Sequence, residues 1–251
     1  MDDDLVRRFR TARRDPELAV VEGFHALKHA LRFGAEVVEA VAVDPNELER
    51  LAADLAPDLV GELAARTVPV PQETLAELVP LMPRTGVVAI ARRPQVDVAA
   101  VLADPRPAPL VLLEDPRNIG NLGACVRVAA AAGAAGLFAT GFNDPWYPDA
   151  LRAGAGLHFA LPVTVVEELP ASDRPLIAID PDGDVLRPRE LPPRAVFAFG
   201  TEREGLSAAL LERADARLGI PMAAGVSSLN LATTVSAVLF AQRLAPGPSA
   251  S

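Results

Sequence analysis

The stretch from Leu110 to Arg127 reads LVLLEDPRNIGNLGACVR, and it decides the fold class. Four consecutive apolar residues are followed by a loop with glycines and asparagines, and then by a segment rich in alanine and valine. This order predicts a buried strand, a loop at its carboxyl end and a helix. Short apolar runs recur downstream with helix-length segments between them, at Gly136–Thr140, Leu176–Ile179, Val196–Phe199 and Arg217–Ile220. We therefore predict an α/β domain built on a parallel sheet.

Chemistry is expected in the loops that follow three of these strands, because ligands bind at the carboxyl ends of strands in open α/β sheets. In the first loop, glycines permit close backbone approach and Asn121 can cap the helix that follows. Arg127 lies on that apolar helix, where it either binds a phosphate or pairs with Glu114 or Asp115; the sequence supports the two interpretations equally. The glycine spacing does not match the dinucleotide-binding pattern G-x-G-x-x-G.

The second loop is Gly200-Thr-Glu-Arg-Glu-Gly, and the third runs from Ile220 to Asn230. A strand that ends in Gly200 exposes backbone that suits a ligand held by main-chain hydrogen bonds, and Glu202 can accept hydrogen bonds from a ligand or another loop. Ser228 and Asn230 are common helix-capping residues, and taken singly that is their simpler interpretation.

The residues before position 95 alternate between helical and strand patterns and predict a small α/β domain. We expect its helices at 17–33, 46–63 and 72–81, and its strands at 36–43, 67–70 and 86–91. Four prolines between 94 and 109 indicate a domain boundary, because proline disfavours helix in the residue before it. The predicted organisation is a domain at 1–95, a stiff linker at 96–108, a second domain at 109–245 and a disordered tail at 246–251.

Composition restricts the classes of function. The chain has 251 residues, half of them apolar, and a formal net charge of −9, which argues against non-specific nucleic-acid binding. One basic run, Arg7–Arg14, is either a phosphate-contacting arm or a solvated helix face. No apolar stretch is long enough to span a membrane, and the N-terminus does not resemble a signal peptide. The single Cys125 cannot form an internal disulfide, fits a reducing cytoplasm and excludes zinc sites built on several cysteines.

Two local patterns suggest metal binding only weakly. Asp180-Pro-Asp-Gly-Asp is similar to the start of a calcium loop, but no glutamate occupies the twelfth position, and a tight turn is the better interpretation. The three histidines have no metal-ligand spacing. We therefore predict no metal site.

Taken together, the three loops resemble the three ordered motifs of the SpoU/TrmH RNA 2′-O-ribose methyltransferases. The matching patterns are N-x-G-x-x-x-R at Asn121–Arg127, G-x-E-x-x-G at Gly200–Gly205, and I-P-M followed by S-L-N between Ile220 and Asn230. Each motif is weak alone, but three in the right order and spacing are specific. Val21-Glu-Gly-Phe and the segment Arg84–Arg92 also make the first domain similar to the accessory RNA-binding domain of the family.

The resemblance implies an α/β fold whose C-terminal part forms a trefoil knot, a cytoplasmic homodimer, and S-adenosylmethionine as cofactor. It implies methyl transfer to a ribose 2′-hydroxyl of structured RNA, either ribosomal or transfer RNA. The final helix, Leu231–Leu244, is apolar enough for a dimer interface, although ordinary core packing explains its residues equally well.

The resemblance also assigns roles to residues. It places the cofactor against Gly200, Ile220, Met222 and Leu229. Arg127 corresponds to the catalytic arginine of the family; because a guanidinium stays protonated, we expect it to orient a phosphate and polarise the hydroxyl rather than act as a simple base. The residues expected to shape the pocket and hold this arginine are Asn121, Glu202, Ser228 and Asn230.

One further segment is expected to meet RNA. Trp146 and Tyr147 either stack on a splayed base or serve as core aromatics, and Arg152 is expected to contact substrate. The family often has lysine where this chain has Asp149 and serine where it has Gly154, which puts the choice of substrate in question.

Two alternatives remain at this level. Beside an RNA ribose methyltransferase, the chain could be a catalytically silent RNA-binding relative or a methyltransferase that acts on a small molecule. Five matching site residues disfavour the first alternative, and the acidic charge keeps the second one open.

Overall fold

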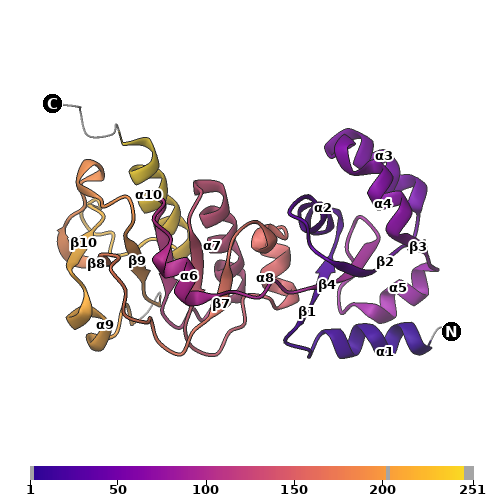
Figure 1. Cartoon of the computed structure of the whole chain (residues 1–251), viewed down its shortest axis with the longest axis horizontal. Helices are drawn as coiled ribbons and strands as arrows, with labels where there is room; N and C mark the ends of the chain where they lie inside the picture. Colours follow the sequence, from indigo (N-terminus) through magenta and orange to yellow (C-terminus); the bar gives the residue numbers. More distant parts are fainter. Residues whose placement is uncertain (1–2, 202–203, 246–251) are drawn as a thin grey trace. The chain divides into compact units, whose positions relative to one another are not determined.

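The computed structural model describes residues 3–201 and 204–245, which form two compact units (Figure 1). The first unit consists of the residues up to Gln95 together with Trp146–Ala160, and the second consists of Val96–Pro145 and the residues from Leu161 onward. No helix in the described ranges is long and apolar enough to cross a membrane.

The first unit is built on a four-stranded sheet in the order β1-β4-β2-β3. β4 is antiparallel to both β1 and β2, whereas β2 and β3 are parallel. The strand bounds are β1 Leu18–Glu22, β2 Val37–Ala42, β3 Thr67–Pro69 and β4 Val87–Arg92. The helices are α1 Asp3–Ala12, α2 Phe24–Arg32, α3 Pro45–Leu55, α4 Val60–Arg66 and α5 Gln72–Leu78, with a 3₁₀ turn at Pro57–Leu59.

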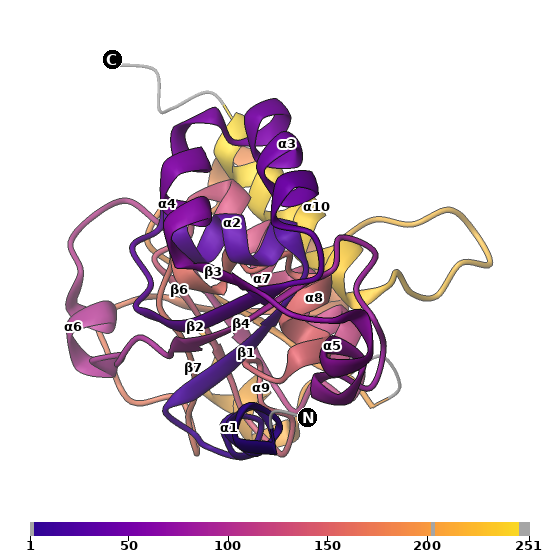
Figure 2. The same cartoon turned by 90° about the vertical axis from the view of Figure 1, so that its right-hand side faces the viewer.

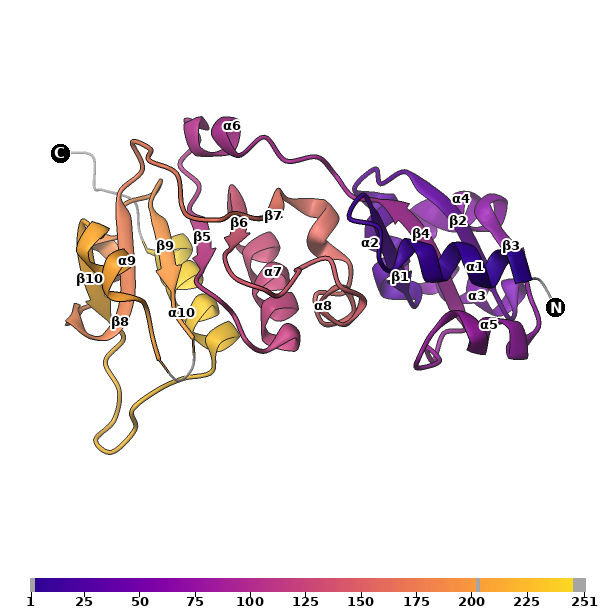
Figure 3. The same ribbon diagram turned by 90° about the horizontal axis from the view of Figure 1, so that it is seen from below.

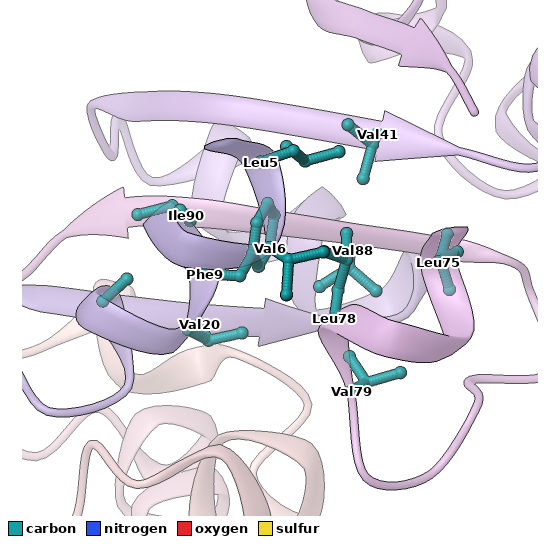
Figure 4. Close-up of a cluster of buried hydrophobic side chains, with 11 residues drawn as sticks. Leu5, Val6, Phe9, Val20, Val41, Leu75, Leu78, Val79, Val88 and Ile90 are labelled. Atoms are coloured by element: carbon teal, nitrogen blue, oxygen red, sulfur yellow. The ribbon is translucent and has the colours of Figure 1, made fainter. Parts of the chain in front are cut away.

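Helices α1 and α5 cover one face of this sheet, and α2 lies on the other (Figure 2). Leu5, Val6 and Phe9 of α1 are buried at helical spacing and pack on apolar side chains of the strands (Figure 4). The opposite side of α1 carries the basic run, where Arg7 and Arg8 pair with Asp4. The exposure of Arg7 and Arg8 is compatible with either interpretation of the basic run.

The helix predicted over 17–33 is wrong in its first third. Leu18–Glu22 forms strand β1, which pairs residue by residue with β4, and α2 starts only at Phe24. Gly23 separates the two elements with a φ of +88°. A short apolar run fits a buried strand or a buried helix, and pairing with β4 decides for the strand. Likewise, the helix predicted over 46–63 is divided into α3, the 3₁₀ turn and α4.

The segment Trp146–Ala160 is predicted in the second domain, but in the structure it packs with the first unit. It contains α8, Pro148–Ala153, and a 3₁₀ turn at Leu157–Ala160. Its turn lies so close to α2 that a Cβ at Gly156 would be 2.5 Å from the Ala26 carbonyl oxygen. The side chain of Glu22 is only 1% exposed, and Arg152 and Arg13 each donate to its carboxylate at 2.7 Å. This buried ion-pair cluster joins α8 to β1.

We expect one partly buried histidine to make the first unit sensitive to pH. His29 Nδ1 donates to the Ala155 carbonyl oxygen at 2.7 Å, and burial lowers the pKa of His29 from its ordinary value. Below the unfolded-state pKa of 6.5, the unfolded chain binds a proton that the folded chain does not, so stability falls as pH decreases toward the lowered folded pKa. We expect thermal unfolding of the first unit to shift less between about pH 7.5 and 5.5 in His29→Gln than in the wild type. Equal shifts in scanning calorimetry would contradict this assignment.

The second unit is a six-stranded sheet in the order β10-β8-β9-β5-β6-β7, with every neighbouring pair parallel (Figure 3). The predicted parallel α/β architecture is therefore confirmed. The strand bounds are β5 Leu110–Leu113, β6 Gly136–Ala139, β7 Val163–Val165, β8 Leu176–Val185, β9 Val196–Phe199 and β10 Ala216–Gly219. The helices are α6 Val98–Ala103, α7 Ile119–Ala132, α9 Ala208–Arg213 and α10 Leu231–Leu244, with a 3₁₀ turn at Pro188–Glu190.

Helices cover both faces of this sheet. α7 and α10 pack against each other on one face, and α6 lies on the opposite face (Figure 3). Alternate strand residues face each side, so Leu110, Leu112 and Ala198 share a core with residues of α6 and α9. On α10, Val235, Val238 and Leu239 are buried within the chain, which favours the core interpretation of these three residues.

The predicted linker is an integral part of the second unit. Helix α6 lies within residues 96–108, and its Leu102 is buried in the core. The side chain of Arg174 reaches this segment, and the whole residue is only 4% exposed. Its guanidinium donates to five backbone carbonyl oxygens at 2.9–3.3 Å, those of Val101, Leu102, Asp104, Ala108 and Arg194. The segment that contains these prolines is therefore fixed to the second unit by hydrogen bonds and is not a free spacer.

The aspartate-rich turn is a bulged excursion of β8. The pairing of β10 with β8 jumps from Arg217↔Ala178 to Leu218↔Asp184, so the residues between them leave the ladder. Within it the Asp182 amide donates to the Asp180 carboxylate at 2.9 Å, which is the predicted kind of local turn bond. Among the described residues, no three side chains of metal-ligating type lie together.

Candidate active site

A pocket of about 310 Å³ lies beyond the ends of β9 and β10 and beside the middle of β8. All four predicted cofactor-contacting residues line it, namely Gly200, Ile220, Met222 and Leu229. Ser228 lines it as well. Because the strands are parallel, their carboxyl ends lie at one edge, and loops far apart in sequence meet there. The volume is at the lower end of the range for small-molecule sites.

The second loop forms one wall of the pocket by folding back on itself. The Thr201 amide donates to the Gly205 carbonyl and the Gly205 amide to the Thr201 carbonyl, both at 3.1 Å. Gly205 has a φ of +68°, and a Cβ at Gly200 would collide with the backbone of Gly205 and Leu206. Only glycine therefore fits at position 200, and its bare backbone faces a prospective ligand. The predicted Glu202 lies outside the described residues.

This close approach gives a testable expectation. Gly200→Ala must open the turn, and such backbone strain costs on the order of 1–3 kcal/mol. We expect affinity for S-adenosylmethionine to fall about tenfold or more in titration calorimetry. Gly61→Ala is the matched control, because a Cβ there would have no neighbour within 4 Å and should leave affinity unchanged. Unaltered affinity in Gly200→Ala would show that the turn does not shape the ligand site.

The first and third loops are joined by two asparagines. Asn230 Nδ2 donates to Asn121 Oδ1 at 3.1 Å, and Asn230 Oδ1 accepts from the Ala232 amide at 3.0 Å, which caps α10. The predicted capping role of Asn230 is thus confirmed. Asn121, in contrast, is not the cap of its own helix. α7 begins at Ile119, and the Asn118 side chain caps it by accepting from the Asn121 amide at 2.9 Å.

The first and second loops are joined by Glu114, which directly follows β5. Its carboxylate accepts from the Ser207 amide at 2.7 Å and from Ser207 Oγ at 2.6 Å. Ser207 in turn caps α9. Asp115 pairs with Arg117 at 2.5 Å. Glu114 and Asp115, the two carboxylates considered as partners of Arg127, therefore bind other residues.

Arg127 is exposed on α7 and forms no hydrogen bond or ion pair with the residues that the structure describes. It does not line the pocket within one chain. It follows Asn121 by six residues, about 9 Å along the helix axis and on a different helix face. Asn121 and Asn230 thus bind each other, and the expectation that they hold Arg127 in place is not met among the described residues.

Several residues of the pocket lie outside the three sequence motifs. Ile179, Asp180 and Pro181 form the wall contributed by β8, and Thr201, Leu231 and Thr234 complete it, together with Phe199. The Asp180 carboxylate accepts from Arg217 at 2.7 Å. An acidic residue directly after a short apolar run is itself a sequence signal for a site, but the turn-like sequence around Asp180 obscured that signal.

The residues expected to meet RNA lie in the first unit. Trp146 is 4% exposed and packs against His158 and Phe159, with ring centroids at 5.5 and 5.1 Å. Of the two interpretations, the core one fits Trp146. The Arg152 guanidinium is bound by Glu22 and also pairs with Asp149 at 2.8 Å. This geometry gives Arg152 a role in holding α8.

Comparison with known proteins identifies the second unit. Residues 108–240, more than half of the chain, match the model of the SpoU rRNA Methylase family. An AdoMet-bound rRNA methyltransferase of Sinorhizobium meliloti has a similar fold, with a TM-score of 0.77 at 25% identity, covering 97% of this chain and 95% of that chain.

Curated relatives match over about half of their own length. A tRNA/rRNA methyltransferase of Synechocystis that is described as uncharacterized is 35% identical over 139 residues, covering 49% of this chain and 48% of the relative. A 23S rRNA (guanosine(2553)-2′-O)-methyltransferase of Bacillus subtilis is 33% identical over 134 residues, covering 48% and 52%. With the family match over its second unit and the fold shared along its length, this chain belongs to the SpoU rRNA methylase family.

Proposed function

We propose that this protein transfers a methyl group from S-adenosylmethionine to a ribose 2′-hydroxyl of structured RNA, with ribosomal RNA favoured over transfer RNA by the Bacillus subtilis relative. The observation that carries the proposal is the pocket between β8 and the ends of β9 and β10, lined by the motif residues Gly200, Ile220 and Leu229.

The pocket residues fit the proposed cofactor. Apolar side chains of Phe199, Ile220 and Leu231 suit the faces of an adenine ring, and the backbone beside Gly200 offers hydrogen-bonding groups to its edge. When bound, S-adenosylmethionine supplies an electrophilic methyl group. The protein contributes by positioning, because in-line attack requires the ribose oxygen to be held close to that group.

The proposed role of Arg127 is to bind the phosphate of the target nucleotide and to orient its 2′-hydroxyl. A guanidinium that stays protonated polarises the hydroxyl, and the nucleotide phosphate receives the proton that the oxygen loses. Asn121 and Asn230 hold the first loop against the third, and Ser228 and Glu202 complete the pocket in this proposal.

We also propose a cytoplasmic homodimer whose C-terminal segment threads a trefoil knot. The knot is supported by the way in which the second loop and the segment before α10 enclose one pocket. The dimer is supported by Arg127, which one chain leaves exposed and outside the pocket lining, so that a second copy has a residue to contribute. The proposed task of the first unit is to bind RNA.

The experiment combines a binding and a mapping step. Titration calorimetry with S-adenosylmethionine should give saturable binding, and ribose-methylation mapping of total RNA from cells with and without the protein should reveal at least one nucleotide that depends on it. Cofactor binding without any new RNA methylation would favour a small-molecule substrate. Absence of cofactor binding would favour a catalytically silent relative.

A further inference from the structure

Phe142 is the most exposed large apolar side chain in the part of the chain that the structure describes. It is 93% exposed, whereas the other phenylalanines of the second unit are largely buried in the core or half-buried. It follows β6 in the loop Thr140-Gly-Phe-Asn143. A fully hydrated phenyl ring forgoes the free energy of burial, so its exposure calls for a reason.

The backbone around Phe142 is held by contacts with the loop that follows β5. Gly141 has a φ of +84°, and a Cβ there would collide with Asp115, whose own φ is +46° although it is not a glycine. The Asp115 amide donates to Thr140 Oγ1 at 3.1 Å, and Asn143 Nδ2 donates to the Pro116 carbonyl at 2.8 Å. Left-handed backbone at a non-glycine residue is a strained state that persists mostly at functional sites. The ring is therefore held in solvent by a braced pair of loops, namely the loop after β5 and the loop after β6.

The place of this loop in the fold relates it to the pocket. β6 pairs with β5, β5 pairs with β9, and β9 ends at the pocket wall Gly200. All three strands are parallel, so their carboxyl ends share an edge, and two strand spacings correspond to about 10 Å. Arg117, with its side chain 68% exposed, pairs with Asp115 in the same braced pair of loops. The loops that carry the aromatic ring and the cation thus leave the sheet at the same edge as the pocket.

We propose that Phe142, assisted by Arg117, is a stacking site for an unpaired base that neighbours the methylated nucleotide. The inference rests on the proposed RNA methyltransferase function and assigns it a substrate feature. An exposed ring offers an open face, and splayed bases are commonly bound by aromatic stacking beside arginine. Arg117 and Asn118 of the adjoining loop are exposed and polar, which suits contact with a nucleic acid.

The test measures the initial rate of methyl transfer to total RNA from cells that lack the protein, as a function of RNA concentration. Phe142→Ala should raise KM for RNA about fivefold or more, because stacking on a base is worth that much by alanine substitution. The kcat at saturating RNA and the affinity for S-adenosylmethionine should stay within about twofold, since the ring lies outside the pocket. Phe142→Tyr and Phe142→Trp should retain the wild-type KM, whereas Phe142→Leu should behave like alanine.

The controls separate this inference from the proposed function. Val185→Ala removes another exposed apolar side chain of the second unit, 59% exposed in β8 and outside the pocket lining, and should leave KM unchanged. Methyl transfer with an unaltered KM in Phe142→Ala overturns the stacking site alone. A loss of molar mass in light scattering with an unaltered KM assigns the ring to a protein interface and also overturns it. Absence of transfer by the wild type overturns the proposed function, and the inference with it.

Discussion

Arg127→Ala should reduce methyl transfer to RNA by about a hundredfold or more, while S-adenosylmethionine binds with nearly unchanged affinity. The side chain is exposed and lies outside the pocket lining, so its removal leaves the cofactor contacts intact. What is lost is a fixed positive charge at the target phosphate and a donor to the reacting hydroxyl. Single-turnover transfer of a radiolabelled methyl group, together with titration calorimetry, would measure both quantities.

Two variants make this result specific. Arg127→Lys keeps the charge but loses the forked geometry, so we expect only a partial recovery of transfer. Arg187→Ala removes an arginine that is 69% exposed in the same unit and pairs with Glu190, and it should retain full activity. Wild-type rates in Arg127→Ala would refute the proposed role, and a parallel loss of cofactor affinity would place the residue in the cofactor site instead.

Arg174→Ala should destabilise the second unit by roughly 2–4 kcal/mol. The substitution leaves buried carbonyl oxygens of the α6 segment without their donor, and Arg194 still reaches only two of the five, those of Leu102 and Asp104. Denaturant unfolding followed by far-ultraviolet circular dichroism would measure the change. The slope with denaturant should stay constant if the same surface is exposed on unfolding.

Arg106→Ala is the matched control for this prediction. Arg106 lies in the same segment, but its side chain is 70% exposed, and its hydrogen bond holds the pKa of Asp104 at about 2. Because the Arg106 side chain lies largely in solvent, screening leaves this pair little contribution to stability, and the unfolding midpoint should barely change near neutral pH. A similar loss of stability in Arg174→Ala and Arg106→Ala would mean that the hydrogen bonds of Arg174 do not stabilise this segment specifically.

The sequence predicts the second unit well because its information is local. Each short apolar run is bounded by glycine, proline or asparagine. A parallel strand that is buried on both faces can be recognised from such a continuous run, without alternating polar residues. The motif loops carry residue types with conformational meaning, so Gly200 and Asn230 are identifiable before any coordinates. Residues such as Phe199 and Leu231 are not, because a core side chain and a pocket wall have the same composition.

What the sequence could not predict depends on partners that are distant in the chain. Leu18–Glu22 has a helix-compatible pattern, and only the neighbouring β4 makes it a strand. The 146–160 segment has no local mark of the unit to which it belongs, since the packing of Gly156 against Ala26 and the pairing of Arg152 with Glu22 join positions more than a hundred residues apart. Arg127 likewise lies outside the pocket because its position in α7 puts it on a different helix face from Asn121.

The discontinuous first unit has a consequence for biosynthesis. Domains commonly fold as they emerge from the ribosome, N-terminal part first, at about 5–20 residues per second. Here residues 1–95 emerge with Glu22 still waiting for Arg152, and the missing piece follows only with residue 160, several seconds later. During that interval the nascent chain carries an uncovered side of β1 and α2 against which α8 and the turn after it will pack. Translation speed across positions 96–160 therefore sets how long this surface is open to chaperones or to aggregation.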